Sequence, residues 1–195
     1  MTNGYYWTWG NQYNDMTNGM VYPCDVDEAR LIDQAEEPYC AVLRLPGGMP
    51  RAAVMISRRG NFGRTDFFDG HRREPYLQYT FNGDLPDMQA DLFHQLTWAR
   101  TWNRKGDLTH GARFKFWTDR RVTASETDVR KQTKTSSEGE LTPERLTHHW
   151  EPFPTFGDFA SILREERSKP VDQQAKDSVT RLLVPIETTG PDPRD

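Results

Sequence analysis

The chain of 195 residues has few cysteines and no long apolar run. Its two cysteines, Cys24 and Cys40, are too few to cross-link a small secreted scaffold, and its N-terminus lacks the residue order of a signal peptide. No window approaches the roughly 20 consecutive apolar residues of a membrane helix. The sequence therefore predicts a cytoplasmic protein with free thiols that does not engage a membrane.

Familiar catalytic motifs are also missing. The sequence contains no Gly-x-Ser-x-Gly elbow, no phosphate-binding loop, no dinucleotide fingerprint and no Cys-x-x-Cys pair. The adjacent His148 and His149 would point about 100° apart on a helix, and no cysteine lies near them to complete a zinc site. We therefore expect no metal and no cofactor, and an enzyme is the least favoured class of function.

Aromatic residues are plentiful. The chain has 10 Phe, 7 Tyr and 6 Trp, which supply apolar area for a core although hydrophobic residues make up only 35% of the chain. The length fits one domain. We predict a single domain over residues 1–187, whose part from 142 to 187 is helical, and a disordered tail over 188–195.

Alternating apolar residues between turn signals predict an antiparallel sheet. The clearest hairpin joins residues 39–45 to 52–57 through Pro46-Gly47-Gly48. Other segments have the same β-prone composition and are bounded by Gly, Asp or Asn. They are residues 5–9, 20–22, 64–68, 75–81, 112–118 and 121–129. Residues 130–141 are almost wholly polar, so we expect a mobile loop there.

Apolar residues at helical spacing predict the helices. Asp25 caps a first helix that ends before Pro38. A central helix is expected over 84–102, where Leu85, Met88 and Leu92 begin an apolar stripe. Further helices are expected after Thr142, after Thr155 and over 171–183. The predicted fold class is α+β: an antiparallel sheet of about five to seven strands packed with one central helix, an N-terminal helix and C-terminal helices.

Charge is unevenly distributed along the chain. The net charge is −6 over residues 1–40, +6 over 41–131 and −4 over 132–195. The acidic N-terminal segment favours a protein-interaction module that binds a basic partner, because complementary charge speeds association and improves specificity. In size and composition the chain is similar to immunity proteins, which neutralise toxin domains. The residues expected to contact the partner are Asp25, Asp27, Glu28, Asp33, Glu36 and Glu37.

Two alternative functions have sequence support of their own. The basic middle segment interleaves arginines with Phe62, Phe67, Phe68 and Tyr76, a mixture typical of single-stranded nucleic-acid sites. The anion-binding candidates are Arg58, Arg59, Arg64, Arg72 and Arg73.

An enzyme with a dispersed site is the second alternative. Glu138-Gly139-Glu140 resembles the Glu-x-Glu element of ADP-ribosyltransferases. That resemblance implies a partnering arginine on an early strand, for which Arg44 or Arg58 is available.

Overall fold

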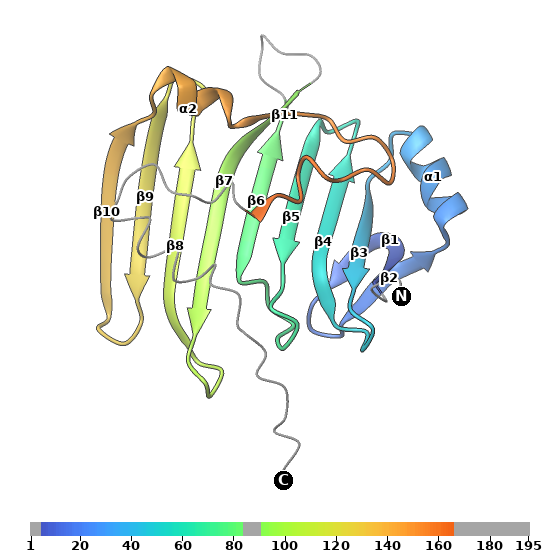
Figure 1. Cartoon of the computed structure of the whole chain (residues 1–195), viewed down its shortest axis with the longest axis horizontal. Helices are drawn as coiled ribbons and strands as arrows, with labels where there is room; N and C mark the ends of the chain where they lie inside the picture. The colour runs from blue at the N-terminus through green and yellow to red at the C-terminus, as the bar shows by residue number, and fades with distance from the viewer. Residues whose placement is uncertain (1–4, 84–90, 166–195) are drawn as a thin grey trace.

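The computed structural model describes residues 5–83 and 91–165 and is dominated by one antiparallel sheet (Figure 1). Ten of the 11 strands follow the order β10-β9-β8-β7-β6-β5-β4-β3-β1-β2, and β11 pairs with the start of β7. The strands are β1 (Tyr6–Asn14), β2 (Gly19–Cys24), β3 (Tyr39–Arg44), β4 (Pro50–Ser57), β5 (Phe62–Phe67), β6 (Leu77–Asn82), β7 (Asp91–Trp102), β8 (Leu108–Phe116), β9 (Arg121–Asp128), β10 (Thr133–Glu140) and β11 (Trp150–Pro152). The helices are α1 (Val26–Gln34) and α2 (Pro143–Thr147).

The local signals of the N-terminal half are confirmed. Strands β3 and β4 pair as the predicted hairpin, and Gly48 adopts φ 81° in its turn, a left-handed conformation that favours glycine. The Asp25 side chain caps α1 by accepting hydrogen bonds from the backbone N–H groups of Asp27 and Glu28. Successive hairpins then extend the sheet from β3 to β6.

The predicted fold class is wrong in its strand number and its helices. The sheet has 11 strands, not five to seven, and residues 91–102 of the expected central helix form β7. The rest of that expected helix, 84–90, lies outside the described residues. The register between β6 and β7 shifts between Thr80 and Phe81, which leaves Gln95 as an extra residue in β7. Leu92 and Ala99, which lie seven residues apart on either side of Gln95, therefore both reach the main core. This spacing of seven residues mimics a helical stripe in the sequence.

The expected mobile loop is also wrong, because residues 133–140 form β10. Every residue of β10 is exposed, so no apolar burial drives its formation. Strand β10 instead pairs with β9 along its whole length. The turn between them is held by Asp128, whose carboxylate accepts a hydrogen bond from the N–H of Lys131. Backbone pairing with an existing strand stabilises a segment whose side chains contribute little.

Among the described residues, the predicted helical part from 142 onward is much less helical than expected. Thr142 does cap a helix, α2, by accepting a hydrogen bond from the N–H of Arg145. Residues 153–165 instead form a chain of turns that crosses one face of the sheet in front of β3 to β6 (Figure 1). The predicted helix over 171–183 and the tail over 188–195 lie outside the described residues.

The two faces of the sheet differ in what covers them. The inner face packs against residues 153–165, and its core is aromatic, as in the stacking of Trp9 on Phe156 with centroids 5.0 Å apart. The outer face carries a small second cluster over β3 and β4, formed by Cys40, Val42, Ala53 and Phe68. At the upper end of β7, His94 stacks on His149 with ring centroids 5.2 Å apart, which joins the segment between α2 and β11 to the sheet.

Candidate functional site

Helix α1 presents an acidic surface with an exposed apolar residue at its centre. Ala29 is fully buried, and Leu31 on the opposite side of the helix is 65% exposed. Asp27 and Glu28 precede Leu31 by four and three residues, so both carboxylates flank it on the helix surface. Helix α1 therefore presents an exposed apolar side chain beside two carboxylates.

Tyr22 lies just before α1 and is both exposed and strained. Its side chain is 76% exposed, and its backbone has φ 47°, a left-handed conformation that is rare for a bulky residue. It belongs to β2, the edge strand that leads into α1. Strain of this kind concentrates at functional sites, because the surrounding structure must hold it in place.

A cavity of about 560 Å³ opens between β1, β2 and the start of α1. Its walls combine aromatic, aliphatic and polar groups, including Trp7, Met20, Pro23, Cys24, Val26 and Arg44. We call the surface formed by this cavity and α1 the acidic end. It comprises Tyr22, Asp25, Val26, Asp27, Glu28, Leu31, Glu36 and Glu37, and in Figure 1 it lies at the opposite end of the sheet from β10.

Five of the six predicted acidic contact residues are exposed at the acidic end. Asp33 is the exception: its side chain is only 8% exposed and its carboxylate accepts a hydrogen bond from Arg58 at 2.8 Å. The carboxylate of Asp25 accepts the capping hydrogen bonds of α1, and the carboxylate of Asp27 forms an ion pair with Arg30 on the same helix. The charges that remain most available to a partner are Glu28 and Glu36, with Glu37 only 3.9 Å from Arg59.

The structure does not bring the predicted arginines together. Arg58 and Arg59 lie in the β4–β5 turn at one end of these strands, and Arg64 is paired with Asp66 at 2.7 Å in the middle of β5. Arg72 and Arg73 follow β5 at its other end, where Arg73 donates to the carbonyl of Met16. Their side chains bind neighbouring segments of the chain, so they form no single anion site.

A different set of basic and aromatic residues gathers on the outer face. Trp98 of β7 has Arg100 at 5.2 Å and Arg113 at 5.5 Å from its ring centroid. Trp117 likewise has Lys115 at 4.8 Å and Arg121 at 5.1 Å. We call these residues the outer cation–aromatic cluster. The sequence did not predict it, because Trp98 and Arg100 lie in the expected helix 84–102 and only strand pairing brings Arg113 beside them. The available signal was the alternation of Arg113 and Lys115 in β8 with Trp117 directly after the strand.

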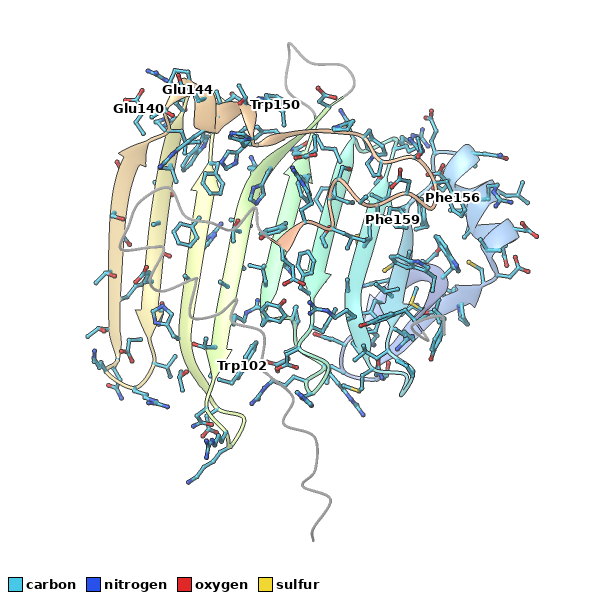
Figure 2. All side chains as sticks on the ribbon, viewed as in Figure 1. Trp102, Glu140, Glu144, Trp150, Phe156 and Phe159 are labelled. Atoms are coloured by element: carbon cyan, nitrogen blue, oxygen red, sulfur yellow. The ribbon has the colours of Figure 1, made fainter. Side chains whose placement is uncertain are left out.

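The glutamates of the ADP-ribosyltransferase resemblance lie on the edge strand β10. Glu140, near the upper end of β10 in Figure 2, forms an ion pair with Arg120. The candidate Arg44 is held several strands away by hydrogen bonds to Thr8, Asn18 and Gly48. Within residues 5–83 and 91–165, no three His, Cys, Asp or Glu side chains gather as a metal site, and no helix is long and apolar enough to cross a membrane.

Cys40 lies beside a small polar cavity of about 140 Å³ on the outer face. Tyr13, Arg64 and Asp66 share this cavity. Burial raises the pKa of the Cys40 thiol from 9.0 to about 12, and burial also raises the pKa of Tyr13 from 10.0 to about 12. Both side chains are therefore held in their neutral forms, which makes Cys40 a poor nucleophile.

Alkaline pH is expected to destabilise the protein through Cys40. The unfolded chain releases the thiol proton near pH 9, whereas the folded chain retains it. The free energy of unfolding therefore keeps its full value below pH 9 and falls as the pH rises toward 12. Above pH 9 this group contributes a loss of about 1.4 kcal/mol per pH unit. Urea unfolding from pH 8 to pH 10 measures the dependence of stability on pH, and Cys40→Ala should make that slope shallower. An equal slope in both proteins would contradict this assignment.

Comparison with known proteins returned no match: no family model, no curated protein and no solved structure resembles the chain.

Proposed function

We propose that this chain is a cytoplasmic protein-interaction module, of the kind to which immunity proteins belong, and that it binds a basic protein partner through the acidic end. The observation that carries the proposal is the exposed Leu31, flanked by Asp27 and Glu28 on α1. A few apolar and aromatic anchors supply most of the affinity of protein interfaces, and surrounding charges guide the encounter.

Two further features support this proposal. Tyr22 adds an aromatic side chain at the margin of the acidic end, and tyrosine is enriched among interface residues that dominate affinity. The adjacent cavity of about 560 Å³ offers room for an apolar or basic side chain of the partner. Both cysteines are free, which is consistent with a reducing compartment.

We expect Leu31→Arg to weaken partner binding about 30-fold, because it places an unpaired cation where an apolar anchor should be buried. Affinity capture from the native host, at low and high salt, identifies co-purifying protein, and the affinity of the purified partner is then measured by calorimetry. Val129→Arg is the matched control, since Val129 is also an exposed apolar residue but lies beyond β9 at the far end of the sheet.

Charge reversal of Glu28 tests whether this carboxylate acts on the rate of association or on the stability of the bound complex. Glu28→Lys should lower the association rate constant and leave the dissociation rate nearly unchanged, because exposed rim charges act mainly on encounter. If Leu31→Arg binds the captured partner as tightly as Val129→Arg, the acidic end is not the binding surface.

The outer cation–aromatic cluster favours a second candidate, a single-stranded nucleic-acid binder. Bases stack on aromatic rings while Arg and Lys neutralise phosphates, and both groups occur on the outer face around Trp98 and Trp117. The same capture experiment separates the candidates. Nuclease-sensitive material that is lost at high salt and absent with Trp98→Ala would favour this candidate over the protein partner.

A further inference from the structure

The two edges of the sheet differ in their ability to accept another strand. Strand β2, at one edge, contains Pro23, which lacks a backbone N–H, and the left-handed Tyr22. Strand β10, at the other edge, pairs with β9 over eight residues without a register shift and contains no proline. Among the described residues, no strand pairs with the edge of β10 that faces away from β9. It is therefore an open template for strand addition.

The backbone groups that β10 offers can be identified from its pairing with β9. The N–H of Leu141 donates to the carbonyl of Arg120 at 2.8 Å, so the 120–141 pair is hydrogen-bonded. Hydrogen-bonded and non-hydrogen-bonded pairs alternate in an antiparallel ladder. It follows that the backbone N–H and C=O groups of three residues point away from β9, toward the free edge of the sheet. These residues are Lys134, Ser136 and Glu138.

The side chains of these residues are self-complementary in one arrangement. If Ser136 lies opposite Ser136 of a second copy in antiparallel pairing, Lys134 lies opposite Glu138 of that copy, and Glu138 opposite its Lys134. Both charge pairs are on the outer face, and the outward backbone groups of the two strands meet as hydrogen-bonded pairs. If the second strand were shifted by one residue, the outward backbone groups would no longer meet and these hydrogen bonds would be lost. If Lys134 or Glu138 instead lay opposite the same residue of the second copy, two like charges would face each other.

We propose that β10 is a homodimer interface, at which two copies pair antiparallel about Ser136 and continue their sheets into one. A two-fold axis places the same strand on both sides of the interface, which is the commonest symmetry of homo-oligomers. Figure 1 shows α1 and β10 at opposite ends of the sheet, so dimerisation leaves both acidic ends free. The dimer stands independently of the proposed function.

Charge variants provide the test, with mass measured by sedimentation equilibrium at low salt. The wild-type chain of 22.7 kDa should sediment with twice that mass at high concentration. Lys134→Glu alone and Glu138→Lys alone should each weaken dimerisation roughly tenfold, because both cross-strand pairs become like-charged. An equimolar mixture of the two variants should form a heterodimer as tight as the wild-type dimer, since every pair is again opposite in charge.

A backbone variant tests the hydrogen bonds directly. Ser136→Pro removes an N–H that faces away from β9, so it should abolish the dimer while the thermal unfolding midpoint of the monomer stays near that of the wild type. A wild-type chain that remains monomeric at every concentration would overturn the proposal. So would a mixture of the two charge variants that associates no better than either alone.

Discussion

Replacing Phe159 by alanine is expected to lower the free energy of unfolding by about 4 kcal/mol, the typical cost of removing a buried aromatic ring. The side chain is 2% exposed and packs against Trp7 and Trp9 with ring centroids 5.4 and 6.2 Å away. Figure 2 shows Phe156 and Phe159 on the segment that crosses the inner face. This segment has no regular secondary structure, so side-chain packing holds it against the sheet together with hydrogen bonds such as the one from the Tyr79 hydroxyl to the carbonyl of Glu165 at 2.8 Å.

Urea unfolding measures the loss, and limited proteolysis shows where it acts. Cleavage within residues 153–165 should become faster in Phe159→Ala than in the wild type, because the segment detaches before the sheet unfolds. Ala160→Ser is the control, since Ala160 is exposed and its substitution should change stability by less than about 0.5 kcal/mol. A loss below about 1 kcal/mol in Phe159→Ala would show that the segment is not anchored by this ring.

Replacing Arg58 by alanine is expected to cost about 3 kcal/mol of unfolding free energy. The guanidinium group lies 2.8 Å from the buried carboxylate of Asp33, donates to the carbonyl of Pro154 at 3.1 Å and covers the Phe153 ring at 4.9 Å. Its removal leaves an uncompensated buried charge, which costs far more than the loss of a surface ion pair. Arg58 thus joins α1, the β4–β5 turn and the crossing segment.

The neighbouring Arg59 is a close control for Arg58. Its side chain is 80% exposed and lies 3.9 Å from Glu37, so Arg59→Ala should change stability by less than about 0.5 kcal/mol. The double variant Arg58→Ala with Asp33→Ala should be more stable than the sum of the two single losses predicts, because no unpaired carboxylate remains. Purely additive losses in chemical denaturation would contradict a direct coupling between the two side chains.

Local sequence signals predicted the elements that local chemistry decides. Pro46-Gly47-Gly48 fits the tight turn between β3 and β4, and Asp25 fits the cap of α1, because each depends on residues only a few positions apart. Residues 91–102 were wrongly predicted as helix because their structure depends on residues that are distant in the sequence. Whether Leu92 is buried depends on β6 and on the crossing segment, and a register shift in β6 lies outside any local pattern.

The candidate sites show the same division. The exposed acids of α1 could be found from charge and helical spacing alone. That Asp33 is held by Arg58, and that the arginines at the two ends of β5 are separated, follows from strand pairing. Nor could the sequence show that Trp98 of β7 lies between Arg100 and Arg113, since β8 brings Arg113 across from it.

By itself, the sequence determined the β3–β4 turn, the cap of α1, the alternation of β3 to β6 and the acidic character of the N-terminal segment. The tertiary structure alone decided that the polar segment 133–140 becomes an edge strand, which charges are paired, and which face of the sheet residues 153–165 cover. The physical reason is the range of the interactions. Turns and caps are stabilised by neighbours in the chain, whereas strand pairing and burial bring together residues distant in sequence.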